Sequence, residues 1–139
     1  MNTEGSLRRF FALLVVAASL SCGGESSTTP SNEPVPGTYT LRTVNRLGLP
    51  YVIADQDSIK VELLSDSFTL TDDKKWAEFG TRRVSFSGQV VIDTIADAGT
   101  YVLNAPTITL ISTNGSIDGS VSGGKLTLTN EAVVAVYQK

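Results

Sequence analysis

Histidine is absent from the 139-residue chain, and cysteine, methionine and tryptophan occur once each. The chain therefore lacks the commonest general base and metal ligand, which excludes Ser-His triads and cysteine–histidine zinc sites. A single cysteine also excludes a disulfide within one chain. No G-x-S-x-G motif occurs, and such a motif would mark a serine hydrolase. We therefore expect that the protein is not an enzyme and binds neither a cofactor nor a metal ion.

Positive charge is also sparse, since 11 Lys and Arg stand against 14 Asp and Glu and the net charge is −3. After residue 21, the basic residues form only two adjacent pairs, Lys74-Lys75 and Arg82-Arg83. Nucleic-acid binding requires clustered Lys and Arg, so no nucleic-acid partner is expected. The length of the chain suits one folded domain.

The longest apolar run has eleven residues and lies near the N-terminus. Arg8 and Arg9 precede it, and it reads FFALLVVAASL over residues 10–20. A helix needs about 20 such residues to cross a bilayer, so this run predicts no transmembrane helix. Its size, positive start and small-residue end are typical of a signal peptide. We predict that residues 1–21 are a signal peptide that is removed.

The single cysteine, Cys22, follows directly in the stretch ASLSCGG. This stretch resembles the bacterial lipobox, in which small or apolar residues precede a cysteine. The resemblance implies cleavage before Cys22 and acylation of its sulfur and new amino group by chains such as palmitate, giving a lipoprotein anchored in the membrane. Gly23 stands where an Asp would imply the inner membrane, which favours the outer membrane of the cell envelope. The alternative is an ordinary secreted protein with an unmodified thiol.

The residues after Cys22, GGESSTTPSNEPVP, are polar, Gly or Pro except for one valine. Such a composition cannot bury enough apolar surface to fold, so it predicts a flexible tether over residues 22–36. The folded domain is then expected over residues 37–139.

From Gly37 onward, apolar and polar residues alternate with a period of two, which indicates half-buried strands. Turn-forming residues separate the runs, which predicts eight to ten short strands joined in order. Strands and turns at this spacing form a barrel or a sandwich. We predict an all-β fold, an antiparallel up-and-down barrel. The last run, AVVAVYQK, is apolar on both faces, which suits a strand covered on both sides or one that seals the barrel. The predicted turns are Gly48 with Pro50, Ser65-Asp66, Thr71–Lys74, Ser87-Gly88, Asp97-Ala98-Gly99, Asn104–Pro106, Asn114-Gly115, Gly123-Gly124 and Asn130-Glu131.

The segments GTYTL, SFTL, GTYVLNAPTITL, GSVSGGKLTLT and VVAVYQK occur in this order over most of residues 37–139. In this order they resemble the small lipocalin-like domains of bacterial envelope lipoproteins. Tyr39 occupies the place of the usual tryptophan in the opening strand. The resemblance implies a closed antiparallel barrel, with or without a cup for a ligand.

Three pairs of carboxylates are candidate acid–base pairs: Asp55 with Asp57, Asp72 with Asp73, and Asp93 with Asp97. Paired carboxylates serve glycosidases, but each pair lies beside a turn signal, so we interpret all three as solvated turn residues. The DQDS stretch has too few oxygen ligands for a calcium loop.

Trp76, the only tryptophan, follows a predicted hairpin. It is interpreted as a rim residue over the end of the core, with an aromatic lip at the barrel mouth as the functional alternative. The residues expected to face inward are large and apolar: Tyr39, Leu41, Ile59, Val61, Leu63, Phe68, Leu70, Phe86, Tyr101, Leu103, Ile108, Leu110, Leu126 and Leu128.

These features favour a lipid-anchored envelope protein that acts as a binding or interaction module. A small apolar ligand in the barrel and an envelope partner on its surface both remain open as binding partners. The alternative is a structural or accessory lipoprotein with a filled barrel. An internal cavity of about 300 Å³ or more would favour a ligand, whereas a solid core with an exposed apolar patch would favour a partner.

Overall fold

The structure is a computed structural model, and it describes residues 34–139. The predicted signal peptide, Cys22 and most of the predicted tether lie outside these residues. No helix within residues 34–139 has the length and hydropathy needed to cross a membrane. The described residues form nine strands: β1 (Gly37–Val44), β2 (Tyr51–Gln56), β3 (Ile59–Leu70), β4 (Lys75–Phe86), β5 (Gln89–Asn104), β6 (Thr107–Ser112), β7 (Gly115–Ser122), β8 (Lys125–Asn130) and β9 (Val133–Gln138).

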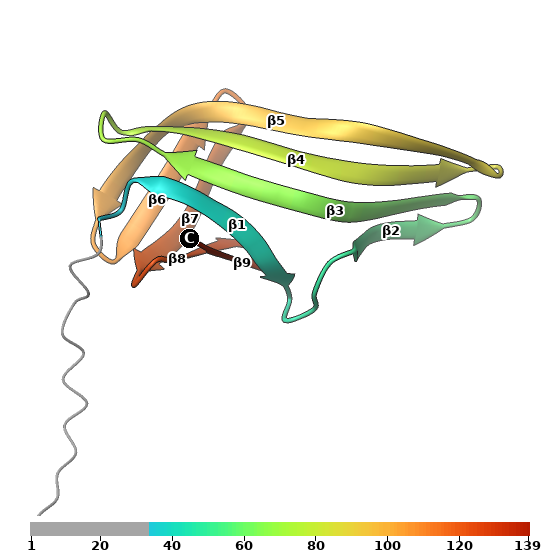
Figure 1. Cartoon of the computed structure of the whole chain (residues 1–139), viewed down its shortest axis with the longest axis horizontal. Helices are drawn as coiled ribbons and strands as arrows, with labels where there is room; N and C mark the ends of the chain where they lie inside the picture. The colour runs from blue at the N-terminus through green and yellow to red at the C-terminus, as the bar shows by residue number, and fades with distance from the viewer. Residues whose placement is uncertain (1–33) are drawn as a thin grey trace, which may run out of the picture.

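Eight of the nine strands close into an antiparallel barrel (Figure 1). Consecutive strands are neighbours from β3 through β9, and β1 closes the circle by pairing with β9 on one side and β3 on the other. This confirms the prediction of an all-β, up-and-down barrel sealed by the last strand. Closure leaves the barrel itself without a free sheet edge.

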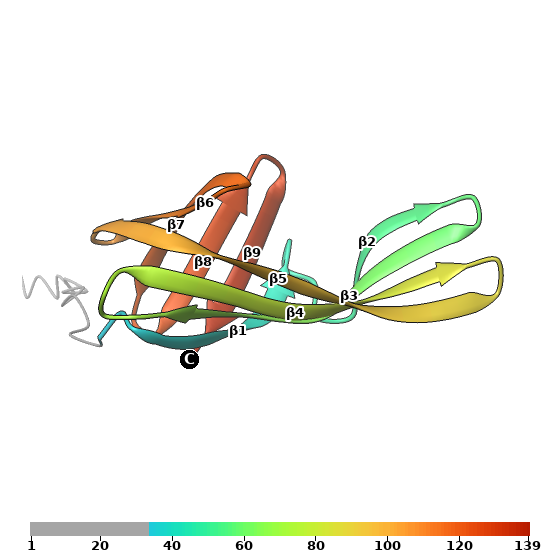
Figure 2. The ribbon, with the colours of Figure 1, turned by 90° about the horizontal axis from the view of Figure 1, so that it is seen from above.

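Three strands are longer than the barrel requires. β3, β4 and β5 continue beyond it and, with β2, form a four-stranded sheet that projects to one side (Figure 2). β1 pairs with β3 only from Ser67 onward, and β6 pairs with β5 only from Thr100 onward. We define the extension as the part in register with β2: Tyr51–Gln56, Ile59–Leu63, Arg82–Phe86 and Gln89–Asp93.

The predicted turn at Ser65-Asp66 is wrong, because β3 runs through it as one strand of 12 residues. The register of β3 against β4 shifts between Leu63 and Ser65, as in a β-bulge. A bulge inserts one residue and so reverses the alternation along the strand. The sequence therefore shows two alternating runs out of phase, which imitates two strands with a turn between them.

Asp97, Ala98 and Gly99 also form no turn, although the sequence predicted one, since all three lie within β5. The glycine serves close packing instead. A Cβ atom at position 99 would lie 1.8 Å from the carbonyl oxygen of Ile111 on β6 and 3.0 Å from Nε1 of Trp76. Only glycine lets β6 and the indole approach β5 this closely.

Trp76 belongs to the core and is 4% exposed, so both its interpretation as a rim residue and the lip alternative are wrong. Its Nε1–H donates to the carbonyl oxygens of Thr100 at 2.9 Å and Ile111 at 3.2 Å. Its ring lies 5.5 Å from that of Phe68. The other buried apolar side chains are Tyr39, Leu41, Val44, Leu70, Tyr101, Ile108, Leu110, Val121, Leu126, Leu128 and Tyr137.

Four residues expected to face into the barrel belong to the extension instead: Ile59, Val61, Leu63 and Phe86. Ile59 and Phe86 are 45% and 51% exposed, because both belong to the extension, where no opposite wall covers them. Val61 and Leu63 share that face and are partly buried. These residues do alternate along their strands, but the apolar face that they form is a sheet face that no second layer covers.

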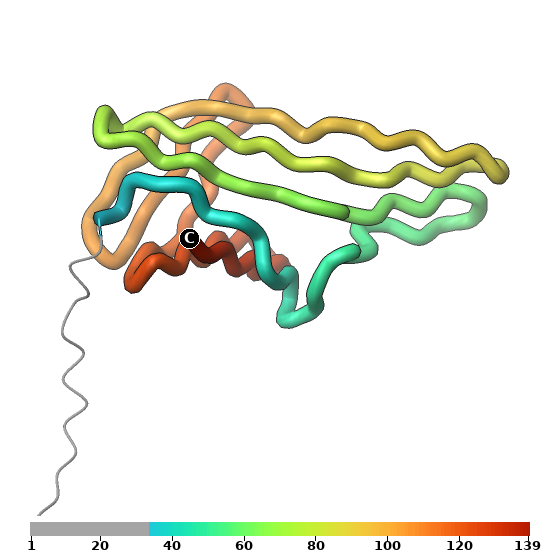
Figure 3. The backbone as a smooth tube through the Cα atoms, in the orientation of Figure 1, coloured from blue at the N-terminus to red at the C-terminus, as the bar shows by residue number. Residues whose placement is uncertain are grey.

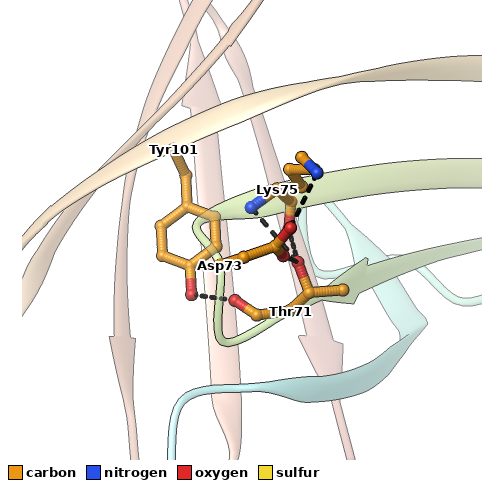
Figure 4. A network of polar contacts seen from close by, with 4 residues as sticks. All are labelled: Thr71, Asp73, Lys75 and Tyr101. Atoms are coloured by element: carbon orange, nitrogen blue, oxygen red, sulfur yellow. Dashed lines mark hydrogen bonds and ion pairs between the residues drawn. The ribbon is translucent and has the colours of Figure 1, made fainter.

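The hairpin between β3 and β4 confirms the predicted turn and fixes one end of the barrel (Figure 4). Oγ1 of Thr71 lies 2.5 Å from Oδ1 of Asp73 and accepts the backbone N–H of Lys75 at 3.2 Å. The Lys75 ammonium pairs with Asp73 at 2.7 Å. The Tyr101 hydroxyl donates to the Thr71 carbonyl at 2.7 Å, which ties the hairpin to β5.

The described chain begins at this same end, away from the extension (Figure 3). Val35 packs against the core, and its carbonyl accepts the Tyr39 hydroxyl at 2.5 Å. Lys139 donates to the Pro34 carbonyl, and its ammonium lies 5.2 Å from the centre of the Tyr39 ring. The two ends of the described chain therefore cover the barrel together.

Candidate functional site

Carboxylates line the interior of the barrel at the end nearer the extension. Glu78 on β4 lies opposite Phe68 on β3 and Asp97 on β5, so all three side chains share the inward face. Asp66, two residues before Phe68 on β3, continues that face. We call the group of Asp66, Glu78 and Asp97 the acidic mouth. Within residues 34–139, no three acidic or thiol side chains are arranged to hold a metal ion.

Asp66 is the most deeply buried carboxylate of the acidic mouth, with 5% exposure. Its Oδ2 accepts the Tyr137 hydroxyl at 2.6 Å, and its Oδ1 accepts the Ser67 backbone N–H at 2.9 Å. Burial raises the pKa of Asp66 to about 6, although both hydrogen bonds favour the charged form. The same burial and the nearby carboxylate raise the pKa of Tyr137 far above its usual value.

Glu78 lies between the other two carboxylates. Burial raises its pKa to about 7, and the negative charges of Asp66 and Asp97 contribute further. Asp97 differs, because the Ala98 backbone N–H and the side chains of Asn114 and Ser112 hydrogen-bond to it and hold its pKa below the ordinary value. Near neutral pH the acidic mouth therefore holds a proton on Glu78 in part of the molecules.

Two small cavities flank Glu78. One, of about 190 Å³, extends from Trp76 to the β6–β7 hairpin at Asn114. The other, of about 140 Å³, extends from Phe68 to Tyr137. Both are smaller than ligand sites for drug-sized molecules, which occupy about 300–1,000 Å³. Large side chains fill the rest of the barrel interior, as an eight-stranded barrel permits.

A wider depression of about 490 Å³ lies over β1 and β9, and it is lined by only five residues. Asn45 anchors it, since its side-chain oxygen accepts the Val134 backbone N–H at 2.8 Å. None of the residues predicted to face inward lines this depression.

Exposed large apolar side chains are concentrated on the extension. Of the thirteen large apolar side chains that are exposed among residues 34–139, seven lie in the extension. The strand register divides them between two faces: Ile59, Phe86 and Val91 lie on the face that continues the barrel interior, and Val52, Val90 and Ile92 lie on the opposite face. Exposed apolar patches mark interaction sites. The seven residues, between 43% and 61% exposed, are Val52, Ile53, Ile59, Phe86, Val90, Val91 and Ile92.

Charged side chains on the extension pair with one another. Arg82 and Asp93 lie opposite each other on β4 and β5 and form an ion pair at 2.5 Å. On the opposite face, Glu62 pairs with Lys60 at 2.9 Å and with Arg83 at 3.2 Å. These ion pairs therefore lie beside the apolar side chains on both faces, and Asp55, Gln56 and Gln89 add exposed polar groups.

The structure separates the residues singled out from the sequence. Cys22 lies outside the described residues. Asp57, Asp72 and Asp73 lie in turns or bends and Asp55 at the end of β2, as expected. Asp93 and Asp97 lie within β5 and not in a turn. Asp93 belongs to an ion pair on the extension, and Asp97 to the acidic mouth.

Sequence reasoning missed Asp66, Glu78 and the extension. The sequence did carry a signal that the two acids face inward. Asp66 stands two residues before the inward Phe68, and Glu78 stands two residues after the inward Trp76, so alternation places each acid on the same face as its aromatic neighbour. The extension carries no comparable signal, since the alternation of its strands is the same as that of the barrel.

The fold and these features define a class: a closed eight-stranded antiparallel barrel with a filled core, an acidic mouth and a projecting apolar sheet. Neither the protein-family models nor the curated proteins include a match to the chain. Among solved structures, the chain is similar to the crystal structure of the Cpx pathway activator NlpE from Escherichia coli, at 18% identity and a TM-score of 0.42. The match covers 70% of this chain and 43% of NlpE, so the chain spans less than half of that protein.

Proposed function

We propose that the protein is a non-catalytic, lipid-anchored envelope protein whose barrel presents the extension to an envelope protein partner. The observation that carries this proposal is the concentration of exposed apolar side chains on the extension, with Ile59, Phe86 and Val91 together on one face. Fully burying an exposed side chain of this size contributes about 1.5–3 kcal/mol, so covering a half-exposed one contributes roughly half of that.

The barrel interior supports a partner more than a small apolar ligand. Its cavities of about 190 and 140 Å³ both include Glu78, and the larger also includes Asp97. Transfer of an apolar ligand to a site beside carboxylates leaves those groups poorly solvated, which is unfavourable. A filled barrel is instead a rigid support for the extension.

The position at which the described chain enters the barrel is compatible with an N-terminal membrane anchor. The described chain starts at the end of the barrel opposite the extension. A tether between Cys22 and this end would span roughly 20 Å at 5–6 Å × √n. The extension would then point away from the membrane that holds the acyl chains. Gly23 after the cysteine favours the outer membrane.

Photocross-linking tests the partner. We expect a photoreactive phenylalanine analogue in place of Phe86 to cross-link an envelope protein in intact cells. The matched control is the same analogue at Val102, which is equally exposed but lies on the outside of the barrel. Equal cross-linking from positions 86 and 102, or none from either, would count against the extension as the binding surface.

The anchor has its own test. We expect Cys22→Ser to release the protein from membranes, because two or three acyl chains contribute about 0.8 kcal/mol per buried methylene and the variant has none. Fractionation and intact-protein mass spectrometry measure this change. A variant that stays in the membrane fraction with no change in mass beyond the substitution would contradict lipidation at Cys22.

A further inference from the structure

One face of the extension, which we call the inner face, continues the interior of the barrel. β4 carries Glu78 in the acidic mouth and Val84 and Phe86 in the extension on this same side, because its register against β5 has no shift. Ile59 on β3 lies opposite Phe86, and Val91 on β5 lies opposite Val84, so both share the inner face. The apolar side chains of the extension therefore lead along one sheet face to the acidic mouth.

No basic side chain among residues 34–139 forms an ion pair with the acidic mouth. Asp66 and Asp97 accept hydrogen bonds only from uncharged groups. Within the same residues, the Glu78 carboxylate has neither a hydrogen bond nor an ion pair. Arg82, which shares the inner face of β4, already pairs with Asp93. The inner face therefore joins an apolar surface to a negative charge that nothing in the described chain balances.

One segment of a partner can reach both parts of the inner face. Phe86 stands eight residues from Glu78 along β4, which corresponds to about 26 Å at 3.3 Å per residue. An extended segment of about eight residues, or a helix of about 17, spans that distance. The stem of a Lys or Arg side chain can also lie along apolar surface while its charged head stays in a polar environment.

We propose that the inner face binds an amphipathic segment of the partner protein, with apolar residues at one end and Lys or Arg at the other. The inference rests on the proposed function, because it states the chemistry of that partner. The apolar end would cover Ile59, Phe86 and Val91, which are 45%, 51% and 58% exposed. The basic end would lie at the acidic mouth, since complementary charges favour association and suppress partners of the wrong sign. The same charge disfavours an anionic lipid surface and a second copy of this chain, whose net charge is −3.

Charge reversal at the acidic mouth tests the sign of the partner. The cells are held at pH 8, where Glu78 is charged because its pKa is about 7. We expect Glu78→Lys to lower photocross-linking from position 86 by about tenfold or more, because it sets like charges against each other. Asp118→Lys is the matched control, since it makes the same change of charge at an exposed position on β7. We expect the control to leave the yield nearly unchanged, because salt screens distant charges.

A second variant keeps the test decisive if Glu78→Lys does not fold. Glu78→Gln preserves the size of the side chain and removes its charge, and we expect it to lower the yield by about threefold or more. Tryptophan fluorescence in urea shows which variants fold. An unchanged yield in a folded variant at position 78, an equal loss in Asp118→Lys, or adducts with lipid or with a second copy would overturn the inference.

The failure of this inference differs from the failure of the proposed function. Cross-linking of an envelope protein from position 86 that does not depend on Glu78 would overturn the basic segment and leave the extension as a binding surface. The absence of any adduct from position 86 in the wild-type background would overturn both.

Discussion

We expect Gly99→Ala to lower the free energy of unfolding by about 3 kcal/mol or more, or to prevent folding. The added Cβ would lie 1.8 Å from the Ile111 carbonyl oxygen, a backbone atom that cannot move without separating β5 from β6. It would also press on Trp76, whose Nε1–H donates to two carbonyls at this point. Urea unfolding followed by the fluorescence of the single tryptophan measures the change.

The matched control is Gly48→Ala, in the loop between β1 and β2. A Cβ at position 48 meets no atom within 4 Å, so we expect stability to change by less than about 1 kcal/mol. Equal stability of the two variants would show that β6 does not approach β5 as closely as described.

The second large effect concerns the acidic mouth and pH. The pKa values of Asp66 and Glu78 are about 6 and 7 in the folded protein, against ordinary values of 3.8 and 4.5. Between about pH 4 and 7 the folded protein therefore holds protons that the unfolded chain has released. The free energy of unfolding falls as pH rises through this window and levels off above it.

We expect Asp66→Asn to remove much of this pH dependence and to stabilise the protein by about 2 kcal/mol at pH 8, with little effect near pH 4. The amide keeps an acceptor for the Ser67 N–H and needs no buried charge. Losing the Asp66 charge also lowers the pKa of Glu78. Urea unfolding at a series of pH values measures the profile.

Tyr137→Phe provides the opposite change. It removes the hydroxyl that donates to Asp66 at 2.6 Å, so the carboxylate loses a partner. We expect a loss of about 1–3 kcal/mol at pH 8. A flat pH profile in the wild-type protein, or parallel profiles for Asp66→Asn and the wild type, would contradict the buried carboxylate.

The barrel could be predicted because its signals are local. Runs such as Thr38–Leu41 and Lys125–Thr129 alternate without interruption, and turns such as Ser87-Gly88 contain residues at positive φ. Strands joined by short turns pair in order, so an up-and-down barrel follows. The closing pair of β1 and β9 agrees with the apolar character of the last run on both faces.

Other features could not be predicted because they depend on contacts between distant residues. The bulge at Leu63 and Ser65 reverses the alternation, and the need for Gly99 arises from Ile111 on another strand. Whether Phe86 faces a core or solvent depends on how far β3, β4 and β5 extend beyond the neighbouring strands β1 and β6. Alternation reports which face a residue occupies, and it does not report what covers that face.

Thiol labelling of the extension in the native envelope tests the central claim most directly. Phe86→Cys and Val102→Cys introduce thiols at positions of nearly equal exposure, 51% and 52% in the single chain. We predict that a maleimide labels Cys at position 86 much more slowly in intact envelopes than in the purified, dilute protein, whereas position 102 labels equally in both. Equal labelling of position 86 in the two settings would contradict the claim that a partner covers the extension.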